Sequence, residues 1–287
     1  MADDDERLRE GVRRCGGALK VRQFAPRAVV RAAWRVLREE GCEATSLEVE
    51  RPLRDEEVVL VAEAVRGNAS LESASFFAHP PDRAHGLREL GEALVRHGGI
   101  KSLMVWKNSV LASAVFESML PSSSVTSLDV RACPGVGDAG SVWIARALKE
   151  NQTLTSLTAG RCGLTSLVAP LLEHNRTLTL LDLSHNDKLG DRGAVIIADA
   201  LARCDCPVRE LRLRRCNIGP EGAAALCEAL LCNSSLVSLV LSGNWIGDVG
   251  AAAIAIALRS NRTLRHLALR SAPWTRMARA SSARRWR

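Results

Sequence analysis

The chain has 287 residues, of which 47% are hydrophobic and 25% charged, so it is long enough to bury a continuous core. Its formal net charge of +7 is typical of proteins that bind nucleic acid, but residues 271–287 hold five arginines and no acid, which leaves +2 for the rest. No stretch reaches about 18 consecutive apolar residues, which excludes a membrane-spanning helix as a prediction.

Residues 1–43 are expected to form an N-terminal cap and a degenerate first copy of the repeat described next. Acidic positions 3–6 lead into a predicted helix through Val12. Leu19 to Val21 lies 28 residues before the similar Leu47 to Val49, and a helix over 26–40 follows. Its apolar stripe contains Trp34, which we interpret as core packing rather than as part of a cofactor site.

Residues 44–270 repeat one phrase about nine times. Its clearest copy has Leu236, Leu239 and Leu241, then Asn244, a glycine-rich turn and an alanine-rich run to Leu258. The alternating apolar residues predict a strand with one buried face, and the alanine-rich run predicts a helix. One copy cannot bury its own apolar face, so successive copies are expected to stack as a parallel sheet covered by helices. The first apolar position falls at Ala44, Leu71, Ile100, Val125, Leu154, Leu178, Val208, Leu236 and Leu264.

Polar residues at fixed places in the phrase have expected structural roles. A buried amide or thiol is predicted after each strand, with Asn108, Asn186 and Asn244 alternating with Cys133, Cys162 and Cys216. Asp191 or Asp248 is expected to cap the helix that follows it. Asn233 and its equivalents precede the first leucine, and we expect them to end the preceding helix in a left-handed conformation. The glycosylation-like triplets at these positions are therefore products of the repeat.

The period of about 28 residues, the Asn/Cys alternation and the Gly-x-x-Gly-Ala helix starts resemble the ribonuclease-inhibitor-like class of leucine-rich repeats. The wording is also similar to repeats of NLR-type immune sensors, Ran GTPase-activating proteins and an axonemal dynein regulatory subunit. The resemblance implies an α/β horseshoe-shaped solenoid, with a parallel sheet on the concave face and helices on the convex face. No phosphate-binding loop of the NLR nucleotide-binding module occurs, so a complete NLR protein is not expected.

Outward strand positions of successive repeats are expected to align on the concave face, where a protein partner would bind. Phe77, Met104 and Trp106 predict an apolar patch beside Lys107 and Arg131, a residue mix typical of interface hot spots. A local register shift that buries Phe77 and Trp106 is the alternative. A second candidate partner-binding group is basic, near Asp182, with a solvated face as its alternative; it consists of Arg212, Arg214 and Arg215.

The sequence favours a non-catalytic protein-binding module or scaffold, because it contains no assembled catalytic motif. No cofactor is predicted. Cys204 and Cys206 lack a second nearby Cys/His pair, so no metal site is predicted either. A Ran-type GTPase-activating protein is the alternative function, although such proteins typically end in an acidic stretch. Nucleic-acid binding lacks the interleaved aromatic residues that would support it. The identity of the protein partner and the oligomeric state are left open.

The two ends of the sequence lead to expectations about the protein's location in the cell and about residues 271–287. The acidic start has no apolar run behind it and is neither a secretory signal nor a mitochondrial presequence, which predicts a cytoplasmic protein, with nuclear or cytoskeletal association open. The nine cysteines are then expected to be thiols. Residues 271–287 form an atypical basic tail with three interpretations: a truncated or misread gene end, a basic anchor, or a cap ordered by a partner.

Overall fold

The computed structural model describes residue 6 and residues 17–22, 27–39, 42–77, 86–118, 123–172, 175–203 and 206–270. The chain divides into two compact units, residues 1–135 and residues 136–287. The helix predicted through Val12 and the basic tail 271–287 lie outside the described residues.

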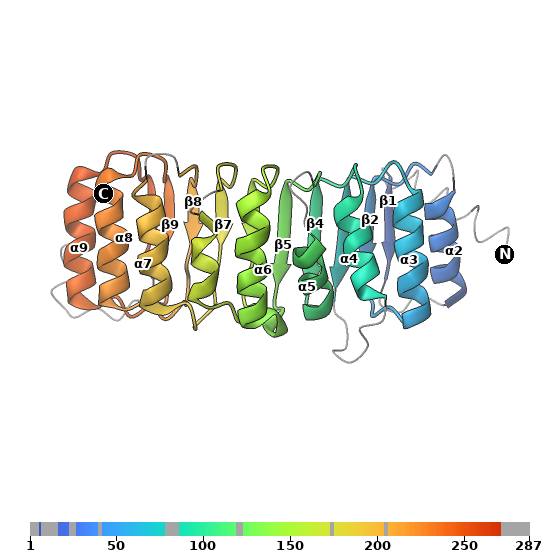
Figure 1. Ribbon diagram of the computed structural model, residues 1–287, viewed down its shortest axis with the longest axis horizontal. Helices are drawn as coiled ribbons and strands as arrows, with labels where there is room; N and C mark the ends of the chain where they lie inside the picture. Colours follow the sequence, from blue (N-terminus) through green and yellow to red (C-terminus); the bar gives the residue numbers. More distant parts are fainter. Residues whose placement is uncertain are drawn as a thin grey trace. The chain divides into compact units, whose positions relative to one another are not determined.

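The first unit alternates strands and helices, and its strands pair in chain order, all parallel, as Figure 1 shows. The helices cover one face of the strands. The strands are β1 (Ala18–Val21), β2 (Ser46–Val49), β3 (Ser73–Phe77), β4 (Ser102–Trp106) and β5 (Ser127–Arg131). The helices are α2 (Arg27–Arg38), α3 (Asp55–Gly67), α4 (Leu87–Arg96) and α5 (Ser109–Ser118).

The second unit follows the same plan, with parallel strands in chain order and helices on one face (Figure 1). Its strands are β6 (Ser156–Thr158), β7 (Leu180–Asp182), β8 (Glu210–Arg212), β9 (Ser238–Val240) and β10 (His266–Ala268). Its helices are α6 (Gly137–Glu150), α7 (Gly190–Leu201), α8 (Pro220–Cys232) and α9 (Gly247–Ser260), with the 3₁₀ helix η2 (Ser166–Leu172) between β6 and β7. A short 3₁₀ helix, η1 (Pro134–Val136), spans the sequence boundary of the two units.

The repeat framework forms the core, as the spacing predicts. Leu211 of β8 pairs with Leu239 of β9, and both side chains are at most 1% exposed. Leu19 pairs with Leu47 in the register expected from their 28-residue separation, and Trp34 is 3% exposed. The α/β solenoid of parallel strands and covering helices is therefore confirmed.

A buried amide ladder joins neighbouring repeats, as expected for Asn244. Its Oδ1 accepts hydrogen bonds from the backbone N–H groups of Cys216 and Ile218, in the preceding repeat. Its Nδ2 donates to the carbonyls of Leu213 and Leu241. All the hydrogen-bonding capacity of this side chain serves the turning backbone, which explains why it is fully buried.

The expected left-handed end of each helix is wrong. Asn233 follows α8 with φ −75° and ψ 129°, which is extended backbone. Its side chain explains the residue choice: Oδ1 accepts from the N–H groups of Ser235 and Leu236, and Nδ2 donates to the carbonyl of Leu201 in the repeat before. Asparagine is needed here as a two-sided hydrogen-bonding group rather than for its backbone freedom.

The expected capping by Asp191 is also wrong in detail. Asp191 makes no side-chain cap on its own helix, α7. Its Oδ1 instead accepts hydrogen bonds from the backbone N–H groups of Gly219, at 2.6 Å, and Gly222, at 2.9 Å. Those amides stand at the start of α8, so the carboxylate caps the helix of the following repeat.

Candidate functional site

The outward face of β3 and β4 carries an aromatic pair. Phe76 is buried, so Phe77 points to the other face, and its ring centroid lies 5.6 Å from that of Trp106 at an interplanar angle of 78°. This is the edge-to-face geometry that aromatic rings prefer. Trp106 is 41% exposed and Phe77 is half-buried. The alternative register shift that would bury both rings does not occur.

Two residues enlarge this aromatic pair into an amphipathic patch. Met104 is half-buried on the same face of β4, two positions before Trp106. The ammonium of Lys107 stands 5.0 Å from the centre of the Trp106 ring, within the range of a cation–π contact. We call Phe77, Met104 and Trp106 the apolar patch, and Lys107 lies at its border.

Arg131 borders the apolar patch but is already paired. Its backbone lies opposite Trp106 in the register of β4 and β5. Its Nε and Nη2 bond the two carboxylate oxygens of Asp129 at 2.8 and 2.7 Å. A bidentate pair of this kind holds the guanidinium in place and neutralises it, so Arg131 contributes a rigid polar rim rather than a free charge.

The second unit separates the predicted basic group into two kinds of arginine. Arg212 bonds Glu210 at 2.7 Å and lies 3.6 Å from Asp182. Arg214 and Arg215 are exposed and have no ion pair among the residues that the structure describes. The predicted cluster is therefore neutralised at Arg212 and cationic at the other two positions. It belongs to a different unit from the apolar patch.

Two further residues, Arg161 and His185, lie at the same edge as Arg215 and were not predicted as site residues. Arg161 and His185 occupy the same place as Arg215 in the two preceding repeats, and all three have positive φ values, from 51° to 63°. The pKa of His185 is lowered below its usual 6.5, first by burial and then by Arg161, Arg214 and Arg215, against an opposite effect of Asp182. The recurring position after each strand was the signal that could have found them.

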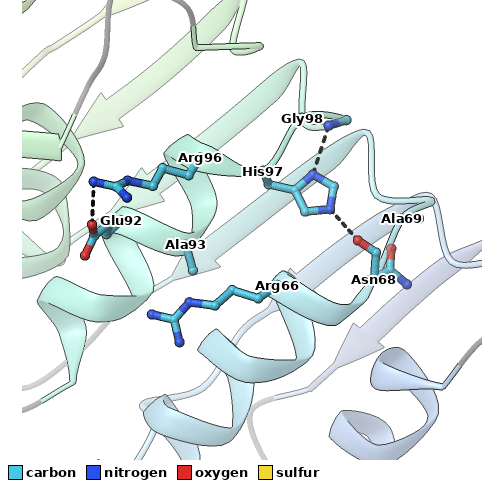
Figure 2. A pocket seen from close by; sticks show the side chains of 9 residues that line it. Arg66, Asn68, Ala69, Glu92, Ala93, Arg96, His97 and Gly98 are labelled. Atoms are coloured by element: carbon cyan, nitrogen blue, oxygen red, sulfur yellow. Dashed lines mark hydrogen bonds and ion pairs between the residues drawn. The ribbon is translucent and has the colours of Figure 1, made fainter.

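A hollow of about 820 Å³ lies beside the ends of α3 and α4, and Figure 2 shows its lining. His97 occupies the position after its helix that Asn233 occupies after α8. Its Nδ1 accepts from the N–H groups of Gly99 and Ile100, so its Nε2 donates to the carbonyl of Asn68 at 2.8 Å. Arg96 pairs with Glu92 at 2.8 Å. Because both nitrogens of His97 bond the backbone, the ring has a structural role. The lining consists of Arg66, Asn68, Ala69, Glu92, Ala93, Arg96, His97, Gly98 and Gly99.

Two buried cysteines of the second unit have unreactive thiols. Burial raises the pKa of both Cys216 and Cys227 to about 12, so these thiols are protonated at neutral pH. Cys206 is buried, and Cys204 lies outside the described residues. The described part of the chain contains no group of three His, Cys, Asp or Glu side chains that could hold a metal ion. Within those same residues no helix is long and apolar enough to cross a bilayer.

Comparison with known proteins agrees with the repeat framework. The Leucine Rich repeat family matches residues 174–198, 205–227 and 232–255. Ribonuclease inhibitor of Sus scrofa is 30% identical over 199 residues, which are 66% of this chain and 43% of that protein. NACHT, LRR and PYD domains-containing protein 5 of Bos taurus is 31% identical over 208 residues, 69% of this chain and 16% of that protein. The chain thus spans less than half the length of these relatives.

A solved structure supports the fold alone. A chain in the crystal structure of the Rad7 and Elc1 complex in yeast aligns with a TM-score of 0.55 at 14% identity, covering 86% of this chain and 68% of that chain. The stacked strands, the buried asparagine and cysteine positions and the relatives lead to the same assignment. The chain contains leucine-rich repeats, and these are similar to the repeats of ribonuclease inhibitor and of NACHT, LRR and PYD domains-containing proteins.

Proposed function

We propose that the chain is a non-catalytic module that binds a protein partner on the sheet face opposite the helices, with the apolar patch as a hot spot. The observation that carries this proposal is the edge-to-face pair of Phe77 and Trp106 at the surface. Trp106 is a large apolar side chain, yet 41% of it is exposed. Tryptophan and other large aromatic side chains dominate the binding energy of protein interfaces.

Three features of the apolar patch support its use as an interface. The ring of Trp106 is fixed by Phe77 on one side and by Lys107 on another, so little conformational freedom remains to be lost on binding. Met104 adds an adaptable apolar surface. The bidentate pair of Arg131 with Asp129 provides an ordered polar rim. Rigid aromatic centre and polar rim together match the anatomy of protein interfaces.

The double substitution Phe77→Ala and Trp106→Ala tests the proposal. The full chain and this variant are immobilised, partners are captured from lysate of the source organism, and the affinity of each captured protein is measured by titration. We expect the variant to bind its partner weaker by about 2 kcal/mol or more, roughly 30-fold. Circular dichroism verifies that both proteins are folded.

Trp245→Ala is the matched control, because Trp245 is 62% exposed in a turn of the second unit and does not belong to the apolar patch. It should bind the partner as tightly as wild type. Equal affinity of wild type and the Phe77/Trp106 variant would show that the apolar patch is not the binding surface.

A further inference from the structure

We propose that Arg161, His185, Arg214 and Arg215 form a site for an acidic segment of a protein partner. We call these four residues the turn-edge basic cluster. The inference rests on the proposed protein-binding function and names the chemistry of one partner segment. It concerns the second unit alone and uses none of the residues of the apolar patch.

The backbone aligns the cluster across three neighbouring repeats. The N–H of Arg161 donates to the carbonyl of Ser184 at 3.0 Å, and the N–H of His185 donates to the carbonyl of Arg214 at 2.6 Å. The N–H of Arg215 continues this ladder to Ser242 at 3.0 Å. Neighbouring strands are about 4.8 Å apart, so Arg161 and Arg215 start about 10 Å apart on a fixed edge. An extended acidic peptide reaches across that distance with two or three side chains.

The backbone conformation at this edge favours other residues. Arg161, His185 and Arg215 have φ values of 57°, 63° and 51°, in the left-handed region where a residue with a Cβ is strained. The equivalent residue one repeat later is Gly243, with φ 76°, which adopts this region without that strain. Basic side chains therefore occupy this position in three consecutive repeats, although glycine would fill it at lower energy. Lys107 and Ala132 adopt the same conformation, so the backbone belongs to the repeat, and the basic character of the side chains sets these three positions apart.

The charges of the cluster are available for a ligand. No carboxylate of the described residues pairs with Arg161, Arg214 or Arg215, whereas Arg212 holds both Glu210 and Asp182. Asp182, the carboxylate that acts on His185, thus already lies 3.6 Å from an arginine outside the cluster. Burial is the first cause of the lowered pKa of His185, and the positive charges of all three arginines lower that pKa further. An incoming carboxylate would relieve this repulsion among like charges.

The surroundings favour an acidic peptide over nucleic acid. The carboxylates of Asp182 and Glu210 lie on the strands beside the cluster, so the positive edge is narrow and bordered by negative charge. A nucleic-acid backbone carries a charge on every phosphate, and tight binding uses about 6–10 phosphate contacts along an extended basic surface. Three arginines on a short edge match a few carboxylates instead, which bind guanidinium groups through charge-assisted hydrogen bonds.

A fluorescent peptide of ten glutamates tests the site, with a ten-glutamine peptide and a ten-nucleotide single-stranded DNA as comparison probes. The variant is Arg161→Asn with Arg215→Asn in the full chain, because asparagine tolerates positive φ and preserves the fold. Fluorescence anisotropy should show wild type binding the glutamate peptide but not the glutamine peptide. The variant should bind the glutamate peptide about tenfold weaker or more.

Two control variants isolate the cluster from general charge. Arg259→Gln with Arg262→Gln removes the same charge from exposed residues outside the cluster and should leave the affinity within about twofold. A second control replaces the arginines of residues 271–287 by glutamine and should preserve the difference between wild type and the Asn variant. The proposal is overturned if the folded Asn variant binds as tightly as wild type, if wild type does not bind the glutamate peptide, or if it prefers the DNA.

The same titrations separate this inference from the proposed function. Phe77→Ala with Trp106→Ala should bind the glutamate peptide like wild type, since those residues lie in the first unit. Loss of partner capture with retained peptide binding would support both surfaces. An unchanged partner affinity in that variant would contradict the apolar patch and leave the basic cluster standing.

Discussion

The left-handed residue that follows each of the strands β4 to β9 determines which side chain lies at the edge of the sheet. Lys107, Ala132, Arg161, His185 and Arg215 all adopt positive φ there, so the same backbone displays very different side chains. In the first unit this position places an ammonium over Trp106, and in the second it places two arginines around a histidine. Function at this edge therefore depends on side-chain identity at a position fixed by the repeat.

The titration of His185 is expected to make the free energy of unfolding depend on pH. Its pKa is lowered in the folded chain relative to 6.5, by burial first and by three arginines next, so the unfolded state binds a proton more readily. The free energy of unfolding should be unaffected by His185 well above pH 6.5 and should fall as the pH drops below that value towards the lowered pKa. Urea melts at about pH 8 and about pH 5.5 measure this loss.

His185→Asn is the comparison for these melts, because asparagine accepts the φ of 63° and does not titrate. Between the two pH values the variant should lose less stability than wild type. An equal loss in both proteins would show that the arginines do not disfavour the protonated imidazole in the folded state.

The candidate site was only partly predictable at this scale. The outward positions of Phe77 and Trp106 follow from strand alternation, but their mutual contact requires the coordinates. The pairing of Arg212 with Glu210 and Asp182 was a local charge pattern that the sequence contains, yet alternation alone does not say which arginine takes the carboxylates. Strand position alone does not distinguish the neutralised Arg212 from the cationic Arg214 and Arg215; the direction and pairing of their side chains do.

At the scale of the element, helix starts depend on the repeat before. Asp191→Ala removes the acceptor of two backbone N–H groups, of Gly219 and Gly222, at the start of α8. We expect the free energy of unfolding to fall by about 1–2 kcal/mol, because capping side chains contribute about that much. Urea denaturation followed by circular dichroism checks the value.

Asp187→Ala serves as the control for this substitution, because Asp187 is an exposed carboxylate in the turn just before α7, the helix that contains Asp191. It should change the free energy of unfolding by less than about 0.5 kcal/mol. If Asp191→Ala were as mild as Asp187→Ala, the carboxylate would not be a cap in solution.

For the whole molecule, the fold was predictable because the apolar spacing recurs often enough to exclude other periods. The strands containing Leu47, Leu211 and Leu239 lie in the expected register, and the buried amide of Asn244 lies where the phrase places it. What the sequence could not provide was the partner of Asp191 and the backbone conformation at Asn233. Both depend on the neighbouring repeat, which a single phrase does not contain.

The alternative function, Ran-type GTPase activation, is tested on the whole chain. Purified Ran is loaded with GTP, and phosphate release is measured with and without the protein in molar excess. The proposed role is binding without catalysis, so we expect no acceleration. Acceleration that persists in the Phe77/Trp106 variant would contradict a purely binding role.

The amide ladder has a consequence for how such a chain can change in length. Asn186 accepts hydrogen bonds from the backbone of the repeat before it, at Cys162 and Leu164, and Asn244 does the same two repeats later, at Cys216 and Ile218. An excision or duplication that starts and ends at the same place in the phrase leaves every amide a partner on both sides. An excision of any other length leaves backbone N–H and C=O groups in the core without hydrogen-bond partners. Chains of other lengths that still fold should therefore differ from this one by whole repeats, because only whole repeats preserve the hydrogen bonds of the amide ladder.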